Sequence, residues 1–351
     1  MRNVVKFGFH DIAQVVPHNM RKPFPMRYFV IFIVLFFWFS TLSFAQEVQE
    51  VQEGEESQVP IFPVYQTLGG IFFWQDTYFY HEWRIQYNIR SGAHRLLDPH
   101  CVCCAVGTYD DCLQRLDELK IERAIPPMKG RVLVLLHGFG SNRLTLQRMA
   151  GWFRTRKTYS AVVNITYPST SVSVQEEARL IHRIVTQMEG VESIDMVGHS
   201  LGALILRCYL GNPPDGERGE LPDPRIRRFV QLCPPNAGLR YAQDALSCET
   251  SGFFQLRPLR DLSLSREEML EQFGTPACEF AIIAGGRGDE NGFSNIIPGD
   301  DDWVVPVQNT RLDGAKDFLL LHGEHGEIPN MIETFLHVER FLNEGAFCTG
   351  T

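Results

Sequence analysis

The second half of the chain alternates short apolar runs with stretches of helical length, and this alternation constrains the fold more than any other feature. Apolar runs typical of buried strands lie at 131–136, 161–166, 194–197, 228–232, 280–284 and 318–321. Helical stretches separate these runs, and a last one follows them at 328–342. Strands that alternate with helices predict an α/β domain with a mostly parallel sheet and helices on both of its faces.

Two of the expected helices are defined closely by their residues. A polar helix is expected over 141–156. Ser173 and Glu176 have the spacing of a capping box, so a second helix should begin after Ser173, and Gly190 should end it. Apolar residues at helical spacing should give this helix one buried face, formed by Val174, Ala178, Ile181, Val185 and Met188.

A serine between two glycines follows the apolar run 194–197. Ser200 stands in the sequence Gly-His-Ser-Leu-Gly, directly before a second apolar stretch of helical type. A sharp turn from strand to helix offers a serine hydroxyl to a base, and glycines are needed where side chains would not fit. The new helix directs its first N–H groups toward developing negative charge. The pentapeptide is common by chance, but its strand-to-helix context favours Ser200 as a nucleophile.

A serine nucleophile also needs backbone donors for an oxyanion, and the sequence offers two. Phe139 follows His137 and Gly138 at the end of the run 131–136, and glycines on both sides of it permit close approach. The N–H groups of Phe139 and Leu201 are therefore the expected oxyanion hole. The alternative is an ordinary glycine turn, which the position directly after a buried strand disfavours.

The acid that orients the base is expected on a loop after a late strand. The loop 299–306 presents three consecutive carboxylates. A calcium loop is the alternative, but the regularly spaced oxygen ligands and the distal glutamate of such a loop are missing. Asp302 adjoins an apolar run and should turn inward, whereas Asp300 and Asp301 should be solvated. We therefore expect Asp302 to be the acid.

The base should come last in the chain, which gives the order Ser, Asp, His. His322 and His325 both follow the run 318–321. His322 continues that strand, whereas His325 stands between glycine-containing turns shortly before the last helix, so His325 is favoured as the base. His137 and His199 adjoin the oxyanion loop and the nucleophile and are expected to be structural.

These motifs together resemble the α/β-hydrolase superfamily and, more narrowly, bacterial triacylglycerol lipases and related esterases. The resemblance runs from about Arg131 to Phe347 and is carried by VLVLLHGFGSN, YPS, MVGHSLGALILR, LCPPNAG, PGDDDWVV and DFLLLHGEHGEI. It implies acyl transfer to water without a cofactor or a metal, through Ser200, His325 and Asp302. The usual second glycine after the serine motif is Ala203 here.

Two stretches interrupt the alternation of strands and helices in the expected catalytic domain, 130–351. The segment 211–224 is rich in Gly, Pro and charge, and the segment 238–273 mixes apolar and polar residues. Both follow the nucleophile, where a lid or substrate-binding cap would lie. Leu221 and a Phe-rich stretch around 253–256 suggest an apolar pocket, although these residues suit the core of a cap equally well.

The amino-terminal part has three expected sections. Basic residues precede an apolar stretch at 28–45 that ends in Ser-Phe-Ala, so 1–45 is expected to be a secretory signal, with Met26 as an alternative start. The alternative is a membrane anchor formed by 28–45. An acidic, Gln-rich spacer should follow at 46–58, and then a strand-rich extension at 59–129. The protein is therefore expected to be exported to the periplasm, the envelope or the medium.

The extension contains an alternating strand pattern and a group of cysteines. The segment 83–89 alternates apolar and polar residues, as half-buried strands of an antiparallel pair do. A zinc site with His100 lacks the usual Cys-x2-Cys spacing, so local disulfides or buried thiols are favoured. The four cysteines concerned are Cys101, Cys103, Cys104 and Cys112.

The net charge limits the class of partner. A formal charge of -9 without a basic stripe argues against nucleic acid. The expected substrate is a small or lipid-like carboxylic ester. The protein is expected to contact a membrane or lipid interface transiently. Two alternatives stay open, which are an acyltransferase on the same scaffold and a non-catalytic envelope binding protein that keeps the fold.

Overall fold

The computed structural model describes residues 73–213, 221–240, 242 and 257–347. The expected signal (1–45), the spacer (46–58), the first residues of the extension and Phe253 to Leu256 of the expected cap lie outside the described residues. None of the described helices is both long and apolar enough to cross a membrane.

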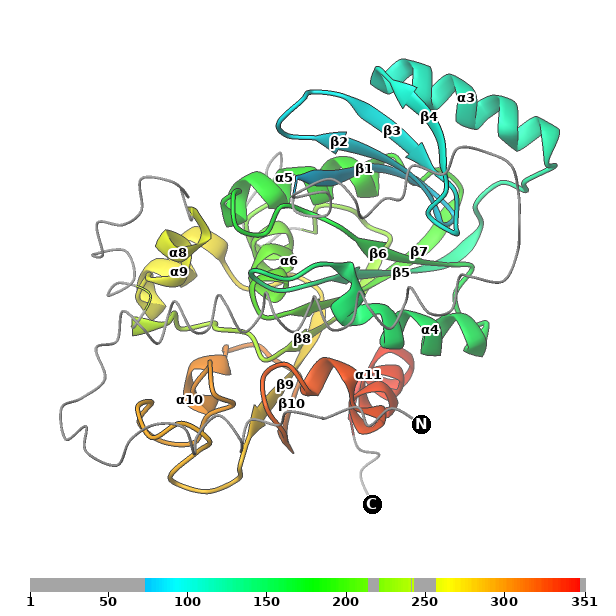
Figure 1. Ribbon diagram of the computed structural model, residues 1–351. Helices are drawn as coiled ribbons and strands as arrows, with labels where there is room; N and C mark the ends of the chain where they lie inside the picture. Colours follow the sequence, from blue (N-terminus) through cyan, green and yellow to red (C-terminus); the bar gives the residue numbers. More distant parts are fainter. Residues whose placement is uncertain (1–72, 214–220, 241, 243–256, 348–351) are drawn as a thin grey trace, which may run out of the picture.

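A six-stranded sheet forms the centre of the catalytic half (Figure 1). Its strand order is β10-β9-β8-β7-β5-β6, and every neighbouring pair is parallel. The prediction of a mostly parallel sheet is confirmed. The strands are β5 (Gly130–Leu136), β6 (Ala161–Ile165), β7 (Val191–His199), β8 (Ile226–Leu232), β9 (Glu279–Gly286) and β10 (Asp317–His322).

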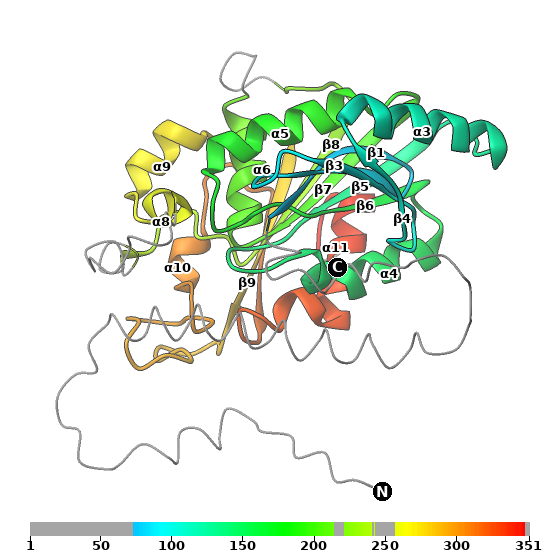
Figure 2. The same ribbon diagram turned by 45° about the horizontal axis from the view of Figure 1, so that its top comes forward.

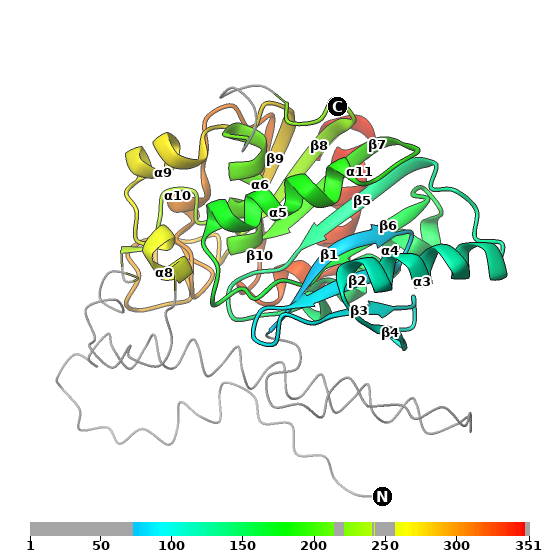
Figure 3. The same cartoon turned by 90° about the horizontal axis from the view of Figure 1, so that it is seen from above.

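Helices cover both faces of this sheet, as predicted (Figure 3). Alternate residues of β5 point to opposite faces, because successive side chains of a strand alternate. Val132 and Val134 pack with α5 (Val174–Thr186), α6 (Leu201–Gly211) and α9 (Arg266–Phe273). Leu133 and Leu135 pack on the other face with α4 (Gln147–Arg156) and α11 (Ile332–Glu344).

Three helix boundaries differ from the sequence expectation. The helix expected from 141 begins as a 3-10 turn at Arg143–Leu146, capped by Asn142, before α4. The last helix is likewise split into a 3-10 turn at Ile328–Asn330, which contains Pro329, and α11, because Met331 between them is extended. The helix α5 begins after Ser173 with both halves of its capping box formed, but it ends at Thr186, before Gly190.

The extension folds as a second, antiparallel sheet of four strands with a helix on it (Figure 2). Its strands are β1 (Trp74–Tyr80), β2 (Trp83–Asn88), β3 (His94–Leu97) and β4 (Cys103–Gly107), and α3 (Tyr109–Glu122) follows. Trp83, Ile85 and Leu96 pack against α3 in a small separate core. The expected antiparallel pair is thus β1 and β2.

The antiparallel sheet is joined to the catalytic half through β1. The N–H of Asp76 donates to the carbonyl of Thr166 at 2.9 Å, and the Asp76 carboxylate accepts from the Thr166 N–H at 2.7 Å. Gln75 donates to Glu177 of α5 at 3.0 Å. The extension therefore covers the end of the edge strand β6, close to the loops that carry the candidate site.

The described part of the expected cap includes the helices α8 (Arg257–Leu262) and α9. Arg207 of α6 anchors α9, since its buried guanidinium donates to the carbonyls of Met269 and Gly274. The same guanidinium donates to Asn236 after β8. The described cap residues are thus fixed to the catalytic core, and a lid function stays a prediction.

Candidate active site

Ser200 lies on a strained turn between β7 and α6. Its φ of 55° and ψ of -121° fall where non-glycine residues are rare, and strain of this kind is typical of functional sites. The two flanking glycines are required sterically. A Cβ on Gly198 would lie 2.6 Å from the Ala203 Cα, and one on Gly202 would lie 2.3 Å from the Leu136 carbonyl oxygen. The turn leaves Ser200 at the carboxyl edge of the sheet, 9% exposed.

The loop after β5 packs directly against this serine. A Cβ on Gly138 would lie 2.9 Å from the Ser200 Cβ, so only glycine fits there without displacement. Within the described chain, neither the Phe139 N–H nor the Leu201 N–H has a hydrogen-bond partner, although Leu201 is buried. Buried donors without partners are rare in folded proteins. Both groups are therefore available to an anionic oxygen near Ser200.

His137 begins the same loop and is held in place by Tyr167. Its ring stacks on Tyr167 with 4.3 Å between centroids, and the Tyr167 hydroxyl donates to the His137 carbonyl at 2.7 Å. Complete burial lowers the pKa of His137 to about 4, so the imidazole is neutral at physiological pH. This geometry agrees with the structural role expected for His137.

Asp302 and His325 form a buried hydrogen-bonded pair. The Nδ1 atom of His325 lies 2.8 Å from Oδ2 of Asp302, and both side chains are almost inaccessible, at 3% and 0%. The N–H groups of Val304 and Val305 donate to the other carboxylate oxygen at 3.0 and 2.6 Å. The backbone N–H of His325 donates to the Asp302 carbonyl at 2.9 Å. The carboxylate is thus fixed on both oxygens and can orient one imidazole.

The loops after β7 and β10 meet beside the serine. Nε2 of His199, the residue before Ser200, lies 3.0 Å from the His325 carbonyl oxygen. Burial lowers the pKa of His199 far below its ordinary value, so its neutral ring donates to this carbonyl. His199 therefore links the nucleophile turn to the histidine loop, a positioning contact that the sequence analysis did not foresee in detail.

Cys233, which follows β8, also belongs to this region. It is fully buried with a φ of 46°, and burial together with the Asp302 carboxylate holds its pKa well above the ordinary value. Among the described residues, His199, Cys233 and His325 are the one group whose side chains could share a metal ion. A protonated thiol is a poor metal ligand, and His325 is already paired with Asp302, so these residues do not fit a metal site. Sequence reasoning missed Cys233, which carries no motif.

Two expectations about neighbouring acids need correction. Asp301 was expected to be solvated, but it is fully buried and accepts hydrogen bonds from the N–H groups of Ser294 and Trp303. Burial raises its pKa to about 6. Asp300 accepts from the N–H groups of Arg287 and Gly288. Both acids therefore shape the loop that presents Asp302, because such turns need acceptors for their backbone donors.

The structure also describes His322, which was the other candidate for the base, and the cysteines. His322 is exposed at the end of β10, where its ring contacts Phe293. The seven described cysteines are all free thiols, so the expected local disulfides are absent from the described residues. Cys112 is the buried thiol of the group that includes Cys101.

Comparisons with known proteins bear on the fold. A family model described as a domain of unknown function (DUF7379) matches residues 106–247, which is less than half of the chain. A search of curated proteins found no match. Among solved structures, the propeptide form of the Bacillus licheniformis lipase BlEst2 is 17% identical with a TM-score of 0.51, and the match covers 64% of this chain and 54% of that one.

Two further structures have lower TM-scores. The mature form of the same lipase is 17% identical with a TM-score of 0.47, over 62% of this chain and 90% of that one. The esterase Pf2001 of Pyrococcus furiosus is 14% identical with a TM-score of 0.41, over 77% of this chain and 90% of that one. At such identities the likeness concerns the fold alone. The parallel sheet, its covering helices and the serine turn are those of this fold, and the chain has the α/β-hydrolase fold that its motifs indicate.

Proposed function

We propose that the chain is a serine hydrolase of carboxylic esters, with Ser200 as the nucleophile, His325 as the base and Asp302 as the orienting acid. The observation that carries the proposal is the buried Asp302–His325 pair, bound through His199 to the strained turn of Ser200. A fixed carboxylate sets the tautomer of the imidazole, so that Nε2 is the ring nitrogen that accepts a proton.

The geometry supports a two-step acyl transfer. Ser200 Oγ attacks the ester carbonyl while His325 Nε2 takes its proton, and the same proton then passes to the leaving alcohol. Water next attacks the acyl-enzyme with His325 again as the base. The unpaired N–H groups of Phe139 and Leu201 would bind the oxyanion of both tetrahedral intermediates, and one such donor contributes about 10²–10³ in rate.

The substrate class is inferred from the Bacillus licheniformis lipase among the solved structures of similar fold. We propose carboxylic esters with an apolar acyl group. Hydrolysis of p-nitrophenyl esters of increasing acyl length tests this, and a maximum at long chains supports a lipase, whereas a maximum at short chains supports an esterase.

A fluorophosphonate probe tests the nucleophile. We expect the folded wild type to be labelled and Ser200→Ala not to be. His325→Ala should lose esterase activity, whereas His322→Ala, the matched control, should keep it. A folded wild type that is not labelled would contradict the proposal and favour a binding protein. Analysis of the products with an added alcohol separates hydrolysis from transfer to that alcohol.

A further inference from the structure

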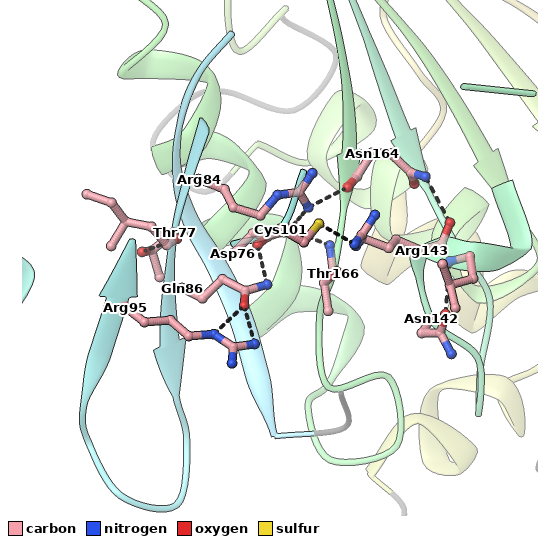
Figure 4. A network of polar contacts seen from close by, with 12 residues as sticks. Asp76, Thr77, Arg84, Gln86, Arg95, Cys101, Asn142, Arg143, Asn164 and Thr166 are labelled. Carbon is pink, nitrogen blue, oxygen red and sulfur yellow. Dashed lines mark hydrogen bonds and ion pairs between the residues drawn. The ribbon is translucent and has the colours of Figure 1, made fainter. Parts of the chain in front are cut away.

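A second polar centre lies where the antiparallel sheet meets the loop after β5 (Figure 4). The Asp76 carboxylate accepts from Arg84 at 3.2 Å and from Gln86 at 2.7 Å. Arg95 donates to Gln86 through two nitrogens. Arg143, the first residue of the 3-10 turn after the oxyanion loop, donates to the sulfur of Cys101 at 2.8 Å. The centre plays no part in the mechanism proposed above.

This centre carries more positive than negative charge. Its guanidinium groups belong to Arg84, Arg95 and Arg143, whereas Asp76 supplies the carboxylate that pairs with Arg84. Arg143 forms no ion pair with any described carboxylate. Arg84 is 3% exposed, and its buried Nε has no hydrogen-bond partner in the described part of the chain. A partly buried excess of positive charge favours a negative group at its centre.

Cys101 occupies this position. Figure 4 shows its sulfur beside the guanidinium groups of Arg84 and Arg143. The residue has a φ of 65°, in the left-handed region that is unfavourable for a non-glycine residue. A turn on Asp98 imposes this conformation, since the Cys101 N–H donates to the Asp98 carbonyl and the Val102 N–H to its carboxylate. The turn thus holds Cys101 in a half-buried position.

No guanidinium group donates a hydrogen bond to the sulfur of another described cysteine. Burial raises the pKa of Cys103 and Cys104, and raises that of Cys112 to about 11. Burial also raises the pKa of Cys208 and Cys278 to about 12. A thiol reacts as its thiolate, which neighbouring guanidinium groups stabilise and apolar burial destabilises. Cys101 is therefore distinguished by the direct contact of its sulfur with the Arg143 guanidinium.

We propose that Cys101 is a site of covalent modification by small anionic disulfides. The Cys101 sulfur attacks one sulfur of the reagent, a new S–S bond forms, and the reagent's own S–S bond breaks. The other half of the reagent leaves as a thiolate and takes a proton from water, so Cys101 is oxidised and the leaving half is reduced. A carboxylate of the reagent pairs with Arg143, which forms no ion pair with a described carboxylate.

The experiment compares two disulfides of opposite charge on the native full chain. Dithiobis(nitrobenzoate) is dianionic and cystamine is dicationic, and peptide mapping after short exposures gives a rate for each cysteine separately. We expect the anionic reagent to modify Cys101 about tenfold faster than Cys103 or Cys104. Arg143→Gln should slow this reaction about tenfold, whereas Arg143→Lys, which keeps the charge, should retain most of it. In urea the cysteines should react at similar rates.

Two results would overturn the proposal. One is a native Cys101 that reacts no faster than Cys103 or Cys104. The other is an unchanged rate and an unchanged preference for the anionic reagent in a folded Arg143→Gln variant. If that variant does not fold, the ionic strength dependence of the wild type decides, because salt must weaken the preference for the anionic reagent. A preference that salt does not change would count against the role of the guanidinium groups.

Discussion

Replacing Glu177 by glutamine should change how the stability of this protein depends on pH. Glu177 of α5 is fully buried, accepts from Gln75 of β1 at 3.0 Å, and has no partner for its second oxygen among the described residues. Burial raises its pKa from 4.5 to about 8. The folded protein therefore holds a proton on Glu177 that the unfolded chain has already lost at neutral pH.

The sign and size of the effect follow from this difference. Between pH 4.5 and pH 8 the folded state binds more protons than the unfolded state, so this group's contribution to the free energy of unfolding falls as pH rises. The contribution is complete below pH 4.5 and lost above pH 8. The shift corresponds to about 5 kcal/mol as an upper limit. Glutamine has the shape of the protonated acid and does not titrate. The free energy of unfolding of the variant should therefore not fall in this way as pH rises.

Urea unfolding at pH 5, 7 and 9 measures the effect. We expect Glu177→Gln to match the wild type near pH 5 and to exceed its free energy of unfolding by several kcal/mol near pH 9. Glu189→Gln, at an exposed position after the same helix, is the control and should follow the wild type throughout. Parallel curves for the wild type and Glu177→Gln would refute the reasoning, since they would mean that Glu177 is ionised in the folded state.

Further predictions concern the site and its supports. Gly138→Ala should lower kcat about 100-fold in a folded protein, because its Cβ would lie 2.9 Å from that of Ser200 and displace the oxyanion donors; an unchanged kcat would contradict this. Asp302→Asn should reduce kcat strongly and Asp301→Asn only slightly, since the asparagine can still accept from the same backbone donors; equal losses would remove the basis for choosing Asp302. Arg207→Met should reduce the free energy of unfolding by about 3 kcal/mol in chemical denaturation, because buried carbonyls lose their donor; wild-type stability would show that they find other partners.

The order of strands and helices could be predicted from sequence because the inner strands of the sheet are buried on both faces. Such strands appear as continuous apolar runs, and the runs at 131–136 and 228–232 lie within β5 and β8. The start of α5 could also be predicted, because the capping box at Ser173 is formed by residues that are close together in the sequence. Helix ends were less accurate, because Pro329 and Asn142 favour 3-10 turns over a full helix.

The candidate site could be predicted only in part. Asp302 and His325 stand at places in the chain that a local pattern marks, and the structure brings them together at 2.8 Å. The buried Asp301 could not be foreseen, since its burial depends on donors from Ser294 in a separate part of the loop. The thiol of Cys233 and the contact between Cys101 and Arg143 join distant segments, and one sequence contains no signal for such pairs.

The hydrogen bonds between Asp76 and Thr166 have a consequence for the synthesis of the chain. Asp76 leaves the ribosome 90 residues before Thr166, its partner on the edge of the parallel sheet. At ordinary translation rates this interval lasts roughly 5–20 s. Throughout it, the charged groups that β1 and β2 will bury are exposed to water, and the antiparallel sheet has no surface on which to dock. The extension is therefore made first but completed late, and a chaperone that acts on this protein would have the longest access to residues before β5.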